Sequence, residues 1–211
     1  MTRSISSCRR SLLAAALAFA LTALPLTAMA QTVDLSGLKY PPSVTVAGSA
    51  LQLNGAGIRY RFVIKVYTAG LYLQAKAATP QAVLAATGPK RLHIVMLRDI
   101  DGNELGRLFT RGMQDNASRE EFSKSIPGTL RIAEIFAAKK RLSNGESFTV
   151  DWVPGLGTVI SINGKTQGDP IKEPEFFNAL LRIWLGQQPA DAALKSALLG
   201  RSAAEPGSPT N

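Results

Sequence analysis

The chain has 211 residues and a formal net charge of +9, with 24 basic and 15 acidic side chains. Its single cysteine, Cys8, lies near the start, so the rest of the chain has no thiol for a disulfide, a nucleophile or a cysteine-ligated metal. The basic residues are scattered, and no basic run carries interleaved aromatic residues. The composition therefore argues against nucleic acid as a partner.

The first thirty residues have the pattern of an export signal. Three arginines precede an apolar run over residues 11–26, and Ala-Met-Ala at 28–30 matches the small-x-small rule for cleavage. A retained membrane anchor is the alternative, but a run interrupted by Pro25 is short for a span of about 20 residues. We expect a signal peptide at residues 1–30, a periplasmic location, no stable membrane span after cleavage, and a net charge of +6.

The next segments predict a lead-in followed by strands. Residues 31–43 are polar and contain two prolines, which is typical of a loosely held lead-in. Apolar residues alternate on either side of Gly48-Ser49, which predicts a hairpin over residues 44–53. Residues 58–73 are dense in β-branched and aromatic residues and predict a strand.

The remaining segments mix helices and strands. We expect helices at 81–86, 102–116, 119–138, 174–185 and 190–199, strands at 91–97, 147–153 and 158–162, and a disordered tail at 201–211. Pro127-Gly128 should kink or split the 119–138 helix. Strands first, then helices, a hairpin and helices again indicate one α+β domain, an antiparallel sheet with helices over one face.

Several residues of types that can carry chemistry have simpler explanations. His93 is the only histidine and lies in a strand, so it cannot supply a zinc site of three protein ligands. Asp99, Asp101 and Glu104 are spaced as the capping residues of a helix. Trp184 lies in an apolar stripe at helical spacing, which is typical of core packing. We expect no metal and no cofactor.

One polar face remains to be explained. Polar side chains occupy alternate positions of the 58–73 segment, at Arg59, Arg61, Lys65 and Tyr67. This alternation is usual for the solvent-exposed face of a strand. A single straight strand would separate Arg59 from Tyr67 by roughly 26 Å. The two side chains serve one ligand only if the chain turns back between them, near Arg61-Phe62.

Several motifs resemble a known family. They are Asn54-Gly-x-Gly-x-Arg59, Val63-Ile-Lys-Val-Tyr-Thr-Ala-Gly-Leu-Tyr-Leu73, Asn163-Gly-Lys165, Ile183-Trp-Leu-Gly186 and Leu198-Leu-Gly200. This set resembles the chalcone isomerase superfamily, in particular its exported bacterial branch, over residues 44–200. The resemblance implies an open-faced β-sandwich, in which a large antiparallel sheet carries a layer of helices with a ligand cleft between them.

The same resemblance argues against chalcone cyclisation. Arg59 matches the arginine of the plant enzyme, but the enzyme's threonine position falls on Tyr67. Its tyrosine, lysine and asparagine positions fall on Leu105, Leu108 and Gly112. These three residues donate no side-chain hydrogen bond, and loss of one such donor typically costs ~3 kcal/mol of transition-state stabilisation. We therefore expect no catalytic residues.

The Arg59 and Tyr67 pair instead resembles the non-catalytic, fatty-acid-binding branch, in which an arginine and a tyrosine hold a carboxylate. We expect these two residues to bind a small acidic, lipid-like ligand. An isomerase or lyase acting on an unknown substrate is one alternative, and an envelope scaffold whose cleft is filled by its own side chains is another. The sequence gives no indication of the oligomeric state.

Overall fold

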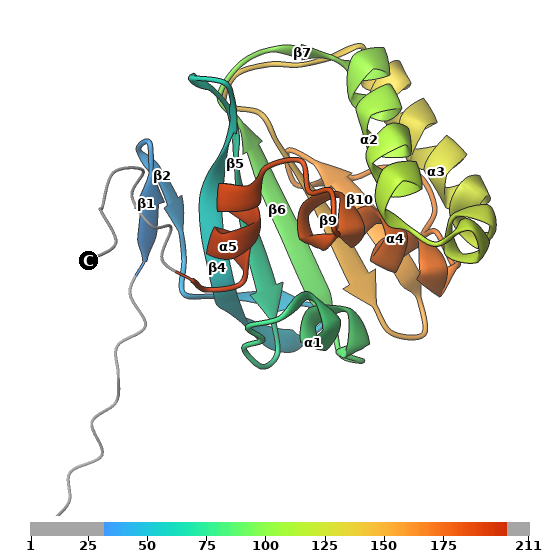
Figure 1. Ribbon diagram of the computed structural model, residues 1–211, viewed down its shortest axis with the longest axis horizontal. Coiled ribbons are helices and arrows are strands. Elements are labelled where there is room, and N and C mark those ends of the chain that lie inside the picture. Colours follow the sequence, from blue (N-terminus) through green and yellow to red (C-terminus); the bar gives the residue numbers. More distant parts are fainter. Residues whose placement is uncertain (1–31, 202–211) are drawn as a thin grey trace, which may run out of the picture.

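A computed structural model describes residues 32–201, which form a curled antiparallel sheet and five helices (Figure 1). The predicted signal peptide and the predicted tail beyond Arg201 lie outside the described residues. The seven-stranded sheet has the order β11-β10-β9-β6-β5-β4-β3. Its strands are β3 (Ser43–Val46), β4 (Ser49–Arg61), β5 (Ile64–Leu73), β6 (Lys90–Met96), β9 (Ser147–Val153), β10 (Gly157–Ile162) and β11 (Lys165–Thr166).

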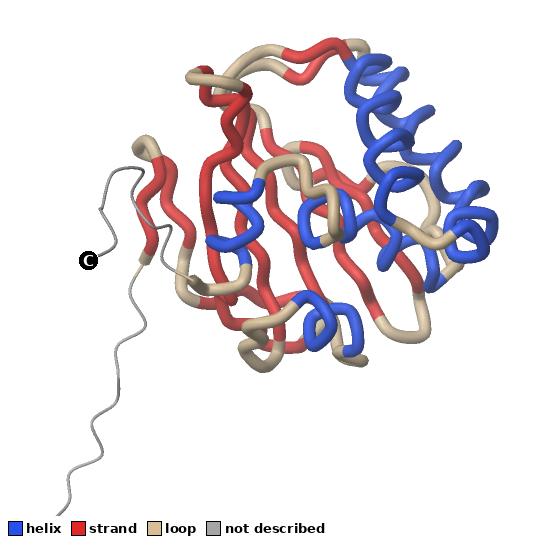
Figure 2. Tube along the Cα trace, viewed as in Figure 1, coloured by secondary structure: helices blue, strands red, loops and turns tan. Residues whose placement is uncertain are grey.

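The helices gather on one side of this sheet (Figure 2). They are α1 (Pro80–Ala85), α2 (Gly102–Asn116), α3 (Arg119–Lys139), α4 (Pro174–Leu185) and α5 (Ala192–Leu198). The main apolar core lies between the helices and the sheet, and Phe136, Phe176 and Trp184 are among its largest side chains. This arrangement confirms the predicted α+β class, with a helical layer on one face.

Local signals in the sequence set the ends of several elements. The side chain of Thr79 caps α1 by accepting from the Ala82 amide at 3.2 Å. Asp101 caps α2 by accepting from the Glu104 amide at 3.0 Å, and Glu104 lies in the first turn, as predicted for these two acids. Asp99 does not cap the helix, because it accepts from the Asn144 amide instead. Asn163 and Gly164 have φ angles of 49° and 76°, which suit the tight turn between β10 and β11.

The predicted loose lead-in is wrong for most of its length. Residues in it form a hairpin of β1 (Val33–Leu35) and β2 (Leu38–Tyr40), which covers the sheet face opposite the helices. Tyr40 is 1% exposed, and its hydroxyl shares a 2.7 Å hydrogen bond with the Thr68 hydroxyl. The ring centre of Tyr40 lies 5.6 Å from that of His93. Strands of three residues are too short to show an alternation of apolar and polar residues, so the sequence did not predict them. The burial of Tyr40 holds the hairpin against the sheet.

Pro127-Gly128 does not split the helix, because α3 continues through both residues. Pro127 is exposed, whereas Gly128 packs against α4. A Cβ placed on Gly128 would lie 2.5 Å from the Phe176 ring, so the two helices touch at this point. Tertiary packing therefore outweighs the local preference of proline and glycine.

A further small ladder joins β7 (Ile100–Asp101) to β8 (Arg141–Leu142).

Candidate functional site

The predicted strand over residues 58–73 is in fact a hairpin. β4 ends at Arg61 and β5 begins at Ile64, with a turn at Phe62 and Val63. In the ladder between these strands, Arg59 is the direct partner of Tyr67. The single long strand is therefore wrong, and the turn lies close to the Arg61-Phe62 position that a shared ligand requires.

A β-bulge beside this pair determines which way the side chains face. Arg59 pairs with Tyr67 and Tyr60 pairs with Lys65, so Val66 is the extra residue on β5. Lys65 donates to the Ser36 hydroxyl at 3.0 Å, on the side of the β1–β2 hairpin. Tyr67 contacts Trp184 of α4, on the side of the helices. The predicted common face of Lys65 and Tyr67 is wrong because the bulge reverses the alternation between them.

The Arg59 side chain lies over the ring of Tyr67. Its guanidinium carbon is 5.4 Å from the centre of the ring, within the range of a cation–π contact. Arg59 is half-buried, and within residues 32–201 its buried Nε has no hydrogen-bond partner. A buried N–H without a partner is unfavourable, so the Arg59 side chain has a donor suited to an anion.

Tyr67 presents a fixed hydroxyl in the same place. It is 3% exposed, and its oxygen accepts a 2.7 Å hydrogen bond from Nε1 of Trp184. Burial raises the pKa of Tyr67, and the nearby Arg59 charge offsets only part of this effect. The phenol therefore keeps its proton at neutral pH. Because the oxygen is the acceptor in the bond from Trp184, that proton remains to be donated.

A cavity of about 160 Å³ adjoins the pair, between the sheet and α2. Leu105, Leu108 and Gly112 of α2 line it, so the three positions predicted to replace catalytic residues gather beside Arg59 and Tyr67. Close packing explains the glycine at position 112, because an added Cβ would lie 3.1 Å from the Ile183 side chain. The other lining residues are Phe109, Arg111, Asp115, Ile183, Gln188 and Ala190.

A second cavity of about 360 Å³ shares Arg59 and Leu108 with the first. Its other lining residues are Arg61, Val66, Arg98, Asp99, Ile100 and Glu104. Asp99 also accepts from the Asn144 amide at 2.9 Å and lies 3.4 Å from the Arg141 guanidinium. Arg59 thus stands between a mainly apolar cavity and a charged one.

Comparison with known proteins identifies the family. A family model described as chalcone isomerase-like matches residues 32–200. The chain belongs to this family. The match includes the β1–β2 hairpin and so begins before residue 44, where the sequence motifs placed the start of the domain. No curated protein sequence matches this chain.

A solved structure supports the same fold for this chalcone isomerase-like protein. The crystal structure of a fatty-acid binding protein from Arabidopsis thaliana superposes with a TM-score of 0.61. It covers 80% of this chain and 96% of its own, at 14% sequence identity. At that identity the likeness shows the fold.

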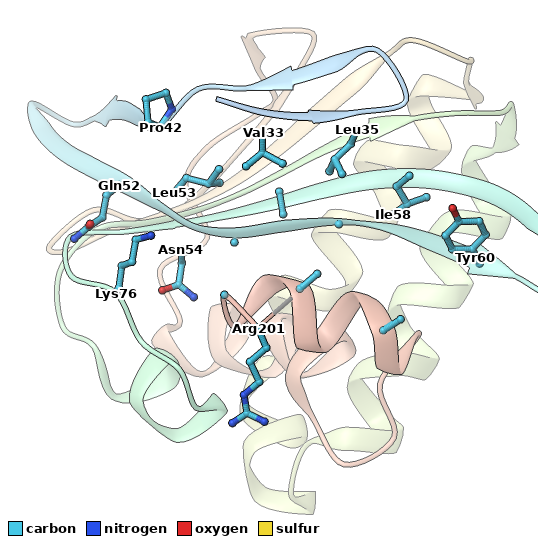
Figure 3. Close-up of a pocket in the computed structure, with 16 residues that line it drawn as sticks. Val33, Leu35, Pro42, Gln52, Leu53, Asn54, Ile58, Tyr60, Lys76 and Arg201 are labelled. Atoms are coloured by element: carbon cyan, nitrogen blue, oxygen red, sulfur yellow. The ribbon is translucent and has the colours of Figure 1, made fainter. Parts of the chain in front are cut away.

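A further cavity, larger than these two, lies away from Arg59 and Tyr67. A groove of about 630 Å³ follows β4 from Gln52 to Tyr60, between the β1–β2 hairpin and α5 (Figure 3). Val33 and Leu35 lie on its hairpin side, and Lys76 and Arg201 are its cationic residues. β3 pairs with β4 only from Ser49 to Gln52, and the groove follows the part of β4 beyond this pairing. No pattern in the sequence predicted the groove.

Two further observations concern the described residues alone. Residues 32–201 contain no cluster of three or more His, Cys, Asp or Glu side chains able to hold a metal ion. Within the same range, none of the helices has the length and apolar character needed to cross a membrane.

Trp184 is 1% exposed, which confirms its predicted place in the core. The sequence did not predict its hydrogen bond to Tyr67, 117 positions away.

Proposed function

We propose that this protein binds a small acidic, apolar molecule such as a fatty acid, without catalysing a reaction on it. The observation that carries the proposal is the placement of Arg59 directly opposite Tyr67, at the edge of a mainly apolar cavity. A guanidinium and a protonated phenol are both donors to a carboxylate. The cavity beside them offers apolar walls to a hydrocarbon chain.

The head group would be recognised by charge and by hydrogen bonds. A guanidinium can give a carboxylate two parallel, charge-assisted hydrogen bonds, and the buried Nε of Arg59 is one donor for them. The Tyr67 hydroxyl adds a third donor, held in place by Trp184. Half-burial of Arg59 strengthens these contacts relative to the same contacts in water.

The volume of the cavity bears on the length of the hydrocarbon chain. Pockets for drug-sized ligands usually measure about 300–1,000 Å³, and the cavity of about 160 Å³ beside Tyr67 is smaller. A short or medium-chain acid would fit it alone. A long-chain acid would have to extend past Leu108 into the second cavity, which is lined by arginine and acidic side chains. We therefore propose that shorter acids are preferred.

The environment around the head group supports binding rather than catalysis. Leu105, Leu108 and Gly112 line the cavity beside Arg59, and none of them can donate a side-chain hydrogen bond to a developing negative charge. Arg111 and Asp115 are the other charged residues of this cavity, and they lie 3.6 Å from each other as an ion pair on α2.

The test is calorimetric titration of the protein with saturated acids from butyrate to palmitate. Arg59→Ala should weaken binding of the best acid by at least about tenfold, because a hydrogen bond to a charged group is worth ~1.5–3 kcal/mol. Tyr67→Phe should weaken it less, since the ring remains. Arg61→Ala is the matched control, because Arg61 lines only the second cavity and should have little effect.

The same titration separates the two candidate cavities. If the acid binds in the groove along β4 instead, Lys76→Ala or Arg201→Ala would weaken binding and Arg59→Ala would not. That result would contradict the proposed site. Absence of binding for every acid in the series would favour the envelope scaffold as the function.

We also propose that the protein acts in the periplasm after residues 1–30 are removed. The support is the arginine-led apolar run and the Ala-Met-Ala sequence before Gln31. Amino-terminal sequencing of protein from the periplasmic fraction should begin at Gln31. Recovery of protein that still carries the first thirty residues would contradict this location and processing.

A further inference from the structure

The turn between β4 and β5 carries the two most exposed large apolar side chains of the described residues. Phe62 is 92% exposed and Val63 is 90% exposed. The flanking residues Tyr60 and Ile64 are 40% and 49% exposed. Figure 1 shows this turn projecting beyond the sheet, away from the helix α1 end of the molecule. Four neighbouring apolar side chains in water, at the tip of one hairpin, are unusual for a surface without a partner.

The backbone at Phe62 makes this exposure more significant. Its φ angle is 56°, in the left-handed region that glycine, asparagine and aspartate tolerate far better than bulky residues. A two-residue hairpin turn usually places glycine or asparagine in such a conformation. Phenylalanine is therefore unfavourable here both for the backbone and for exposure to water. Neither the folding of the turn nor the packing of the core accounts for it.

Cationic side chains surround the apolar tip. Arg61 and Lys65 flank it in sequence and are exposed, and Arg98 lies with Arg61 around the second cavity. Two acids near the tip are already engaged. Asp99 lies 3.4 Å from the guanidinium of Arg141, and Asp191 accepts from the Tyr60 amide at 2.9 Å.

Glu104 is the other acid in the lining of the second cavity, beside Asp99. It lies in the first turn of α2, where the helix dipole favours a negative charge. Arg61, Lys65 and Arg98 therefore outnumber the two acids that line this cavity, and one of these acids, Asp99, already lies beside Arg141. This end of the molecule therefore carries exposed apolar side chains, Phe62 and Val63, with basic side chains around them.

We propose that Phe62 and Val63 insert into the interfacial region of a membrane that contains anionic lipids, with Arg61, Lys65 and Arg98 contacting the phosphate groups. Apolar side chains at a tip with basic residues around them are the combination that gives peripheral membrane binding. This surface is distinct from the proposed carboxylate site. Arg61 lines the cavity that Arg59 also lines, so docking would bring the mouth of that cavity to the lipid surface.

The size of the apolar surface favours a membrane over a protein partner. A stable protein interface usually buries about 800 Å² on each side, far more than a two-residue turn presents. Shallow insertion into a lipid interface needs only a few apolar side chains together with charge attraction. A second copy of the chain or another protein is therefore the less favoured occupant, and the experiment below separates these cases.

The test is cosedimentation of the purified protein with vesicles, without added fatty acid. The protein should bind vesicles of phosphatidylcholine and phosphatidylglycerol in equal parts, and bind vesicles of phosphatidylcholine alone more weakly. Raising the salt concentration should reduce the binding, because ions screen exposed charges. Replacing both Phe62 and Val63 by serine should lower the partition coefficient by at least about tenfold. Leu156→Ser is the matched control, because Leu156 is 50% exposed at the turn between β9 and β10 and should not change binding.

A second variant protects the test against loss of folding. Phe62→Gly should leave the melting temperature unchanged or raise it, because glycine accepts the positive φ angle. The same variant should lose vesicle binding while fatty-acid titration in solution stays unchanged. Failure of the wild-type protein to bind either vesicle, or equal binding by Phe62→Gly, would overturn the proposal. So would a lipid-free dimer that the double serine variant converts to a monomer, since the tip would then be a protein contact.

Discussion

Nε1 of Trp184 donates a 2.7 Å hydrogen bond to the hydroxyl of Tyr67, joining α4 to strand β5 inside the core. Both residues are almost fully buried, at 1% and 3% exposure. The bond satisfies the indole N–H and at the same time directs the phenol proton away from Trp184. A residue of the core thereby orients a residue of the proposed site.

Trp184→Phe tests this orientation. The variant removes the indole donor and leaves Tyr67 without its buried partner, so we expect a loss of about 1–3 kcal/mol in the free energy of unfolding. Acid binding should weaken several-fold, because the hydroxyl loses the contact that positions it. Chemical denaturation and calorimetric titration measure the two effects. In a Tyr67→Phe background, Trp184→Phe should have little further effect on binding, and an undiminished effect there would show that Trp184 acts in another way.

Leu108→Trp tests the position of the acyl chain. Leu108 is 38% exposed and lines both cavities beside Arg59, so a larger side chain should fill the space that the ligand needs. Binding should fall by at least about tenfold, while stability should change by only about 0.5 kcal/mol because the site is partly exposed. Leu130→Trp, on the exposed face of α3 at 61% exposure, is the control. Equal affinities for both variants and the wild type would place the ligand elsewhere.

Glu146 should make a measurable contribution to acid stability. Its carboxylate accepts hydrogen bonds from Lys139, the Ser143 amide and Asn163, each at 2.8 Å, and these donors, the Lys139 side chain above all, lower its pKa to about 2. The unfolded state therefore binds more protons than the folded state at mildly acidic pH. The stabilisation is complete above the ordinary glutamate pKa of about 4.5 and is lost as the pH falls toward 2.

Glu146→Gln should reduce the free energy of unfolding by about 2 kcal/mol at neutral pH and flatten the loss of stability below pH 4.5. Denaturation measured across a pH series gives both quantities. Glu134→Gln serves as the control, since Glu134 is an exposed glutamate on α3, 3.8 Å from Arg131. If the two variants show the same pH profile, the hydrogen bonds around Glu146 have no special effect.

Purified protein should not accelerate the cyclisation of a 2′-hydroxychalcone by more than a small factor. The reason is the apolar character of Leu105, Leu108 and Gly112 beside Arg59, which supplies no side-chain donor to the developing charge. Absorbance at the chalcone band follows the reaction against a blank without protein. Robust turnover that Arg59→Ala abolishes would show instead that Arg59 and Tyr67 suffice for catalysis.

Sequence patterns that involve only neighbouring residues predicted much of the fold. Thr79 and Asp101 cap the helices that follow them, and the Asn163-Gly164 pair makes a tight turn, because these preferences depend on a residue and its immediate neighbours. Tyr40 shows where such reasoning fails. The short strands β1 and β2 depend on its burial against Thr68 and His93, which come from other strands.

For the proposed site, the sequence by itself determined which residues were candidates: Arg59 and Tyr67, with Leu105, Leu108 and Gly112 in place of donors. Only the tertiary structure decided how they meet. The turn at Phe62 makes Arg59 and Tyr67 direct partners, and the bulge at Val66 turns Tyr67 toward the helices and away from the face of Lys65. A bulge is a mismatch in length between two paired strands, so its position depends on the register of both strands and cannot be read from the alternation within one of them.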